Sequence, residues 1–263
     1  MMLARARVGV VARHYLVDLQ LYTAICAAVL ALAGIASVAS APMMLGRSGA
    51  ANAAARLPGP VAKLLGLAVG RSLDTGVGHL NATFLSVVLP IALIALGIVG
   101  AAKAIAGAAA TGELEMLASQ PVTRTQIVGE RLIAIVLAQI QAALPATIIV
   151  AVGSHLGDIG VGGLTVLGGA ARSIVLAALI TAAVMMVSSV TSKPAVPAAI
   201  GAALTLVVFL VSASGASSIS PARLALTSAP AAGGGWLGTA AVAFASIWIT
   251  VIAGVAFERR DIC

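Results

Sequence analysis

Apolar residues in this chain follow one another in six long uncharged runs. The runs cover residues 21–41, 82–102, 132–152, 173–192, 194–212 and 236–257. About 20 residues of helix, at 1.5 Å per residue, cross a bilayer core of about 30 Å, and a helix satisfies its own backbone hydrogen bonds in lipid. The strands of a transmembrane β-barrel would instead alternate apolar and polar residues with a period of two. The pattern predicts an all-α polytopic membrane protein, with six transmembrane helices in a single domain over residues 1–263.

Two polar segments carry helical patterns of their own. Residues 1–20 combine arginines with apolar positions at helical spacing, which predicts either an amphipathic interfacial helix or a charged flank that anchors the first span. Residues 42–81 place Val61 and Leu65 at helical spacing, which predicts a short surface helix. The first run, residues 21–41, is longer than the apolar region of about 7–15 residues in a signal peptide. We therefore expect a retained first span.

Composition excludes an ordinary soluble domain. Hydrophobic residues make up 61% of the chain and charged residues 9%, against about 25% charged in globular proteins. An even number of spans places both termini on one side, and putting them in the cytoplasm assigns nine of the fifteen Lys and Arg residues to that side, as the positive-inside rule favours. We predict a multi-pass plasma-membrane protein with cytoplasmic termini and no nucleic-acid partner. Its expected interfacial anchors are Arg5, Arg7, Arg13, Arg259 and Arg260.

A few polar side chains lie in or beside the runs. Gln139 and Gln141, in the third run, either line a transport path or hydrogen-bond between packed helices, and the second interpretation is favoured. Arg172 precedes the fourth run. Either the span starts after it, with the side chain snorkelling to the outer interface, or it lies in a protein-lined cavity. We expect the first arrangement.

No residue spacing indicates chemistry on this chain. A P-loop pattern is absent from the sequence. The three histidines are scattered over predicted loops and flanks, where they cannot converge on a metal. No acid lies inside a run, which argues against a proton relay or an ion-coupled carrier. We therefore predict no catalytic residue, metal site or cofactor here, and a protein that is not an enzyme by itself.

The segment GELEMLASQPVTRTQIVGER at 112–131 is a polar island that holds three of the eight acids. Thr111 is placed to cap a short helix with acids in its first turn. Pro121 ends that helix. The Thr-x-x-Gln sequence at 123–126 matches a capping box that opens the next helix. The pattern predicts two helices joined by a hinge, either docking a partner or forming a solvated loop without one.

The stretch TGELEMLASQPVTRTQIVGERLIA resembles the loop after the second span of type-2 ABC exporter permeases. There a Gly-Thr-Leu-Glu-Leu-Leu-Leu-Ser-x-Pro-Val-Ser-Arg run precedes a basic residue that opens the third span. Glu113 stands where the family usually has threonine. The ending AFERRDI is similar to the Phe-x-Arg-Arg-Asp-Leu close of many such permeases. An inner N-terminal helix, six spans and a polar first outer loop complete the likeness, which covers essentially the whole chain. The matching loop residues are Leu114, Glu115, Met116, Leu117, Ser119, Pro121, Val122, Thr123, Arg124 and Arg131.

This resemblance implies a mechanism. Residues 103–131 would be a cytoplasmic coupling loop, and two permease copies, identical or homologous, would surround a path with six helices each. Each copy would sit in membrane lipid and dock a separate cytoplasmic ABC ATPase, which would bind the ATP and Mg. The residues implied for docking are Glu113, Leu114, Glu115, Met116, Leu117, Ser119, Pro121 and Arg124.

The expected function is therefore export of an amphiphilic, drug-like, lipid or peptide substrate. The alternative is a scaffold or assembly factor that docks a cytosolic protein through residues 112–131 without transporting anything. A membrane enzyme and an ion-coupled carrier are less favoured, because the runs lack clustered His, Asp or Glu.

Overall fold

A computed structural model of the chain describes residues 10–46, 49, 52, 55–65, 67, 73–113, 123–214, 220–226 and 236–258. Within these residues there are helices and no strands. Six of the described helices are long and apolar enough to cross a membrane, which confirms the predicted all-α polytopic class. They are Gln20–Met44, Gly76–Ala110, Arg124–Leu156, Gly163–Val190, Ala195–Ser214 and Trp236–Glu258.

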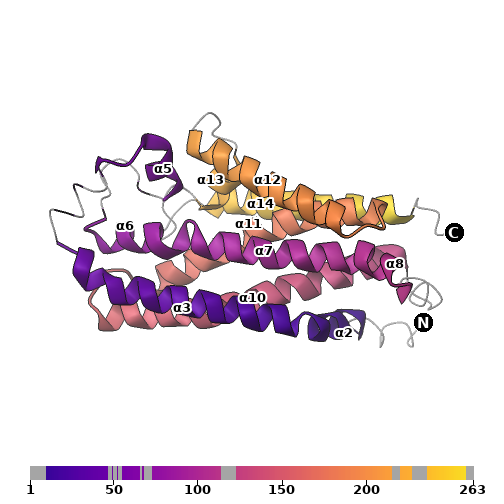
Figure 1. The fold of residues 1–263 in the computed structure, drawn as a ribbon, viewed down its shortest axis with the longest axis horizontal. Helices are drawn as coiled ribbons and strands as arrows, with labels where there is room; N and C mark the ends of the chain where they lie inside the picture. The colour runs from indigo at the N-terminus through magenta and orange to yellow at the C-terminus, as the bar shows by residue number, and fades with distance from the viewer. Residues whose placement is uncertain are drawn as a thin grey trace.

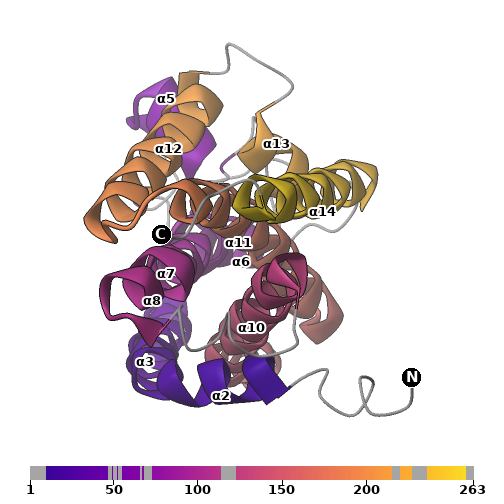
Figure 2. The ribbon, with the colours of Figure 1, turned by 90° about the vertical axis from the view of Figure 1, so that its right-hand side faces the viewer.

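The six spans form one elongated bundle (Figure 1). Its middle consists of α7 (Val88–Ala102), α10 (Arg124–Leu156) and α11 (Gly163–Val190), which pack on one another. The first span, α3 (Gln20–Met44), lies along α10. The last two spans, α12 (Ala195–Ser214) and α14 (Trp236–Glu258), cover α11 from the other side, as Figure 2 shows.

Short helices occupy the two ends of the bundle. One end carries α5 (Gly59–Leu64), α6 (Gly76–Leu80) and α13 (Pro221–Leu226), and the other carries α2 (Val10–Asp18) and α8 (Ala108–Ala110) (Figure 1). The second end also receives the start of α10 and the end of α14, and we call it the loop end. Both described chain ends and the two sides of the 112–131 island therefore lie together.

The helix α2 runs across the bundle, whereas α3 runs along it (Figure 2). The direction changes at Leu19, which is buried, and α2 packs against α10. Tyr15 is buried on the packed side, while Arg13 and Asp18 are exposed. This supports the amphipathic-helix interpretation of residues 1–20 over the simple charged flank, for the part that the structure describes.

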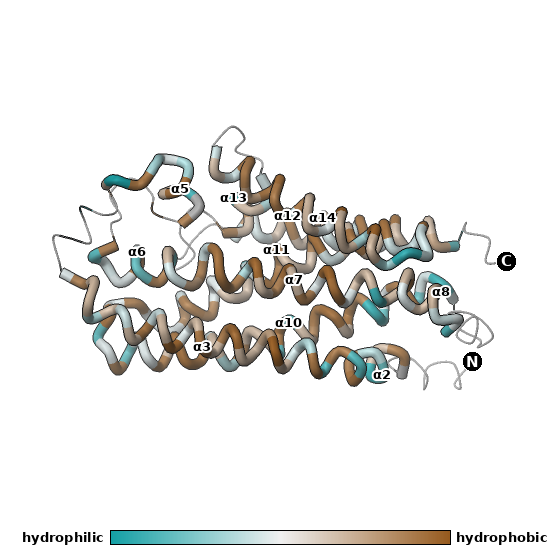
Figure 3. Tube along the Cα trace, in the orientation of Figure 1, coloured by the Kyte–Doolittle hydropathy of each residue, from teal (hydrophilic) through white to brown (hydrophobic). Residues whose placement is uncertain are grey.

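Hydrophobic residues cover the spans and polar residues gather at the two ends (Figure 3). In the interior, Gln139 of α10 is fully buried, and its Nε2 donates to the carbonyl of Leu93, 3.1 Å away, and to the Thr181 hydroxyl at 3.0 Å. Glycine at position 97 leaves room for these hydrogen bonds, because a Cβ there would clash with the Thr181 hydroxyl oxygen at 2.1 Å. Gln139 therefore joins three helices, as the favoured interpretation predicted.

The second span is interrupted by two π-helical turns, η1 (Asn81–Leu85) and η2 (Lys103–Gly107), on either side of α7. A π-turn displaces the regular hydrogen-bond register. In η2 the backbone N–H of Ala106 donates to the hydroxyl of Ser188 on α11, 2.9 Å away. The loop end of this span is thus attached to α11 through a side chain.

Helix boundaries differ from the apolar runs at several ends. The third span starts at Arg124 rather than at 132, and the fourth at Gly163 rather than at 173. Arg172 therefore lies inside the helix α11, which begins before the apolar run, and the point at which this helix enters the lipid stays a prediction. Its side chain is 1% exposed, with the guanidinium carbon 4.6 Å from the Trp236 ring centroid. The arginine is therefore enclosed by protein, and its guanidinium group makes a cation–π contact with the Trp236 ring of α14.

Candidate functional site

The described part of the polar island stops at Glu113 and resumes at Thr123, and both residues lie at the loop end. Most of the predicted docking residues lie between these two positions and outside the described residues. They are Leu114, Glu115, Met116, Leu117, Ser119 and Pro121. The structure does describe both sides of the island and the contacts that hold them.

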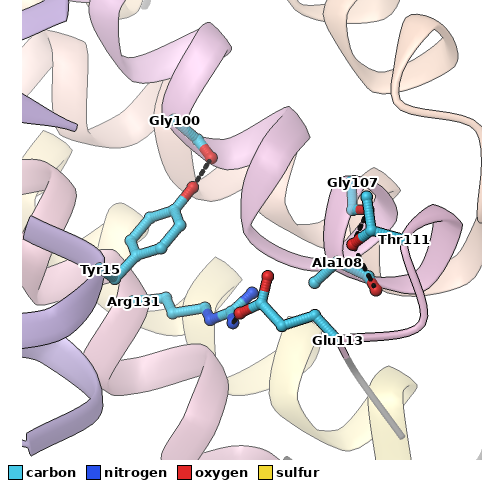
Figure 4. Close-up of polar contacts among 7 residues, drawn as sticks. All are labelled: Tyr15, Gly100, Gly107, Ala108, Thr111, Glu113 and Arg131. Atoms are coloured by element: carbon cyan, nitrogen blue, oxygen red, sulfur yellow. Dashed lines mark hydrogen bonds and ion pairs between the residues drawn. The ribbon is translucent and has the colours of Figure 1, made fainter. Parts of the chain in front are cut away.

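On the outgoing side, Thr111 ends a helix instead of starting one. Its hydroxyl donates to the carbonyls of Gly107 and Ala108, at 3.2 and 3.3 Å (Figure 4). Gly112 follows with a φ of +75°, the left-handed conformation that closes many helices and that glycine adopts without strain. Thr111 has helical dihedral angles, φ −96° and ψ −1°, instead of the extended backbone of an N-cap residue, so the prediction that it caps the next helix is corrected.

On the returning side, the predicted cap is present. Thr123 has the extended backbone of an N-cap residue, and its hydroxyl accepts a hydrogen bond from the backbone N–H of Gln126 at 3.2 Å. The Gln126 side chain donates to Glu130, one turn further along, at 3.3 Å. Thr123 thus starts α10 as predicted, but only half of the predicted capping box is formed, because the Gln126 side chain bonds Glu130 and the structure, for these described residues, shows no bond from it to the N–H of Thr123.

Glu113 and Arg131 join the two sides of the island. The Nη2 of Arg131 lies 2.7 Å from Oε1 of Glu113. The arginine side chain is 2% exposed and the glutamate side chain 46% exposed. A buried charge needs a counter-ion, because desolvation disfavours it otherwise. Within the described residues, Nε and Nη1 of Arg131 have no hydrogen-bond partner, so Glu113 is the anionic contact that the structure gives this arginine.

Tyr15 of α2 completes this cluster. The guanidinium carbon of Arg131 lies 4.9 Å from the Tyr15 ring centroid, a cation–π geometry. The phenol donates to the carbonyl of Gly100 on α7 at 2.6 Å (Figure 4). Burial raises the pKa of the Tyr15 phenol well above its ordinary value, although the charge of Arg131 opposes this. The phenol therefore stays a neutral donor around neutral pH and connects α2 to both α7 and α10.

Glu130 fastens the start of α2 to α10. Its Oε2 accepts a hydrogen bond from the backbone N–H of Ala12 at 3.2 Å, and its side chain is buried. Ala12 lies in the first turn of α2, where backbone N–H groups lack helical partners and the helix dipole favours a negative charge. A carboxylate from one helix thus caps another.

Arg124 connects the start of α10 to the end of α14. Its Nη1 donates to the carbonyls of Phe257 and Glu258, at 3.3 and 3.5 Å, and its guanidinium carbon lies 5.7 Å from the Phe257 ring centroid. A cation at the carboxyl end of a helix is stabilised by the helix dipole. Arg124 was predicted to dock a partner, and the structure gives it a role inside the bundle. Whether it also contacts a partner stays a prediction.

The remaining predicted residues lie apart from this cluster. Arg13 is exposed on α2, in keeping with an interfacial anchor. The other four anchors, Arg5, Arg7, Arg259 and Arg260, lie outside the described residues. Of the two proposed path-lining residues, Gln139 is fully buried between helices and Gln141 is exposed on the outside of α10. The structure therefore does not bring Gln139 and Gln141 to a common surface.

Sequence reasoning missed Tyr15 and the capping role of Glu130. The available signals were a tyrosine on the apolar side of a helix that otherwise carries aliphatic residues, and adjacent opposite charges, Glu130 and Arg131, at a predicted membrane boundary. The roles of Tyr15 and Glu130 follow from the packing of α2 across α10, which the sequence does not show.

Comparison with known proteins adds no further assignment: no protein-family model and no curated protein matches this chain. The fold and the loop end define a multi-pass, all-α membrane protein. Its polar island is held at the loop end by the Glu113–Arg131 ion pair, by the Tyr15 ring of α2 against Arg131 and by the N-cap at Thr123.

Proposed function

We propose that this chain is the transmembrane permease subunit of an ATP-driven exporter of the ABC class. In this proposal the loop end faces the cytoplasm, and residues 112–123 dock a separate ATPase. A second permease copy completes the transport path in the plasma membrane. ATP and Mg bind to the ATPase, and the permease itself has no catalytic residue.

One observation carries the proposal: the island that resembles a coupling loop is attached on both sides to the spanning helices. Glu113 on the outgoing side pairs with Arg131 in α10, and Thr123 on the returning side caps α10. A displacement of the island therefore acts on α10 at two points. A solvated loop with no mechanical role requires neither attachment.

The contacts also suggest how such a displacement spreads. Arg131 stacks on Tyr15 of α2, and Tyr15 binds the carbonyl of Gly100 on α7. Arg124 binds the last carbonyls of α14. Movement of the start of α10 would thus reach α2, α7 and α14 together. ATP shifts such an equilibrium only if its binding favours one arrangement of these helices over the other.

The transported molecule is proposed by chemical class only. The middle parts of the spans are apolar, and two of their buried polar groups, Gln139 and Thr181, bond to each other. This favours an amphiphilic, drug-like, lipid or peptide substrate over a small hydrophilic ion.

The test is coupling between the island and ATP hydrolysis. We expect Leu117→Asp and Glu115→Lys to insert normally in the membrane and to abolish ATP-dependent uptake of a fluorescent amphiphile into inside-out vesicles. Glu113 is left intact, because its loss would also disturb Arg131. Leu65→Asp, at the opposite end, is the matched control and is expected to retain uptake. Undiminished uptake by both island variants would refute the permease assignment.

The second candidate, a non-transporting scaffold, rests on the same docking segment. It is distinguished by the ATPase that copurifies with the chain. For a permease, removal of the chain or the Leu117→Asp change alters the rate of ATP hydrolysis by that partner. A partner whose ATP hydrolysis is unaffected, or a partner that does not hydrolyse ATP, would favour the scaffold.

A further inference from the structure

Gln141 presents a polar group to the outside of the bundle near the middle of a spanning helix. It is the eighteenth of the 33 residues of α10, Arg124–Leu156, and its side chain is exposed. Within the described residues the structure shows no hydrogen bond from its amide. At this depth the surroundings are lipid tails, which neither donate nor accept hydrogen bonds. An amide left there without a partner is costly.

Pro145 adds a second polar atom at the same place. A helical proline has no N–H to bond the carbonyl four residues earlier, and that carbonyl belongs to Gln141. Pro145 is itself exposed, on the same face one turn away. The outer face of α10 therefore carries both a side-chain amide and a backbone carbonyl that lacks its usual helical donor.

Several hydroxyl side chains near the outer surface of the spans are satisfied within their own helices. The hydroxyls of Thr205, Ser246 and Thr250 donate to carbonyls three or four residues earlier, each at 2.7 Å. The neighbouring amide, Gln139, is buried and bonds α7 and α11. Gln141 differs from these residues, since it is both exposed and without such a bond in the described structure.

Large apolar side chains surround Gln141 on the same face. They form a stripe along α10 with exposed fractions of 37–56%, made of Ile133, Leu137, Ile140, Leu144, Ile148 and Val152. The spacing of three and four residues is that of a helix seam that packs on another helix. Lipid can cover the apolar part of the stripe but leaves the amide unsatisfied.

We propose that the outer face of α10 is where two copies of this chain meet, with Gln141 of each copy hydrogen-bonded to Gln141 of the other. An amide offers both a donor and an acceptor, so it complements itself. A two-fold axis along the membrane normal keeps each residue level with its own copy. Self-pairing therefore gives the mid-membrane amide a partner at its own depth. The proposal concerns the dimer surface and does not depend on transport.

Site-directed crosslinking tests the surface directly. The background is the full chain with Cys26→Ala and Cys263→Ser, reconstituted in phosphatidylcholine vesicles. Under copper-phenanthroline oxidation we expect Gln141→Cys to form a covalent dimer in clearly higher yield than Ile247→Cys. Ile247 is an equally central, exposed residue of α14 and serves as the depth-matched control. Leu32→Cys and Leu206→Cys probe the middles of α3 and α12.

A dimer crosslinked through α3 or α12 but not through position 141 would overturn the proposal. So would equal yields at 141 and 247, or no covalent dimer at any position. Crosslinking of the Gln141→Cys variant to a different polypeptide would assign the face to another protein and would equally overturn self-pairing.

A second measurement uses the uncrosslinked dimer. Dimerisation is measured by energy transfer between labelled copies. Hydrogen bonds between membrane helices contribute modestly to association, so Gln141→Leu is expected to weaken dimerisation about three- to tenfold. Gln141→Asn keeps an amide and is expected to restore most of the affinity. Unchanged dimerisation of Gln141→Leu, or equal loss in both variants, would contradict the hydrogen bond between the two glutamines.

Discussion

The Glu113–Arg131 pair is unequal, because the arginine is buried and the glutamate is half exposed. Removing Glu113 leaves a buried cation without its anion, whereas removing Arg131 leaves a carboxylate that water can reach. Breaking a fully buried pair costs about 3–5 kcal/mol. Because Glu113 is partly solvated, we expect Glu113→Ala to lower the free energy of unfolding by about 2 kcal/mol and Arg131→Met by less.

Unfolding by SDS in mixed micelles measures both changes. The double variant Glu113→Ala/Arg131→Met should be more stable than Glu113→Ala alone, since it removes the uncompensated charge. Strictly additive losses would show that the two side chains do not interact. Glu258→Ala, an exposed acid at the same end, serves as the control and should change stability little.

Tyr15 gives the protein an alkaline pH dependence. Its pKa is raised by burial, so the folded state holds the phenol proton more tightly than the unfolded state does. This contribution to stability is fully present below the unfolded pKa of about 10. It is lost as pH rises above that value toward the higher folded pKa.

Tyr15→Phe tests this pH dependence, because it keeps the ring over Arg131 and removes the hydroxyl. It should cost about 1 kcal/mol at neutral pH through the lost bond to Gly100. From about pH 10 to about pH 11 it should flatten the decline in stability that the natural chain shows. Unfolding midpoints of both proteins across this pH range test the assignment, and parallel declines would contradict it.

The helix α2 packs mainly against α10. It has nine residues, too few for an isolated helix to be stable in water. Glu130 satisfies the N–H of Ala12 and complements the helix dipole. We expect Glu130→Ala to increase amide exchange over residues 10–18 by about three- to tenfold, while exchange within α11 stays unchanged.

Glu130→Gln separates the hydrogen bond from the charge in this capping contact. The glutamine oxygen still accepts from Ala12, so its effect on exchange should be smaller. If Glu130→Ala leaves α2 as protected as before, packing of Tyr15 and Leu19 rather than the cap holds the helix.

At the element scale, features that depend on neighbouring residues could be predicted from the sequence, whereas contacts between distant residues could not. The N-cap at Thr123 was predictable, because it depends on residues three apart. The start of α11 was not, because hydropathy marks the lipid-embedded part of a helix and this helix begins before its apolar run. Arg172 illustrates this: its contact with Trp236 comes from a helix more than sixty positions later, which no local pattern contains.

At the scale of the whole molecule, the number of spans followed from the six apolar runs along the chain, because lipid admits few alternatives to a helix. The site did not follow in the same way. Glu113, Glu130 and Arg131 were visible as a charged island, but their partners Tyr15 and Ala12 lie about a hundred residues away. Such pairings require the path of α2 across the bundle.

The even number of spans makes a prediction about sidedness that tests the whole arrangement. From the positive-inside rule we predict that the loop end lies in the cytoplasm. In the cysteine-free background, Gln120→Cys should react in intact cells only with a membrane-permeant maleimide. Lys63→Cys, near the opposite end on exposed α5, should react with an impermeant one as well. The reverse pattern would put the island outside the cell, where no ATPase could drive it. Labelling of both positions from the same side would contradict the six-span bundle itself.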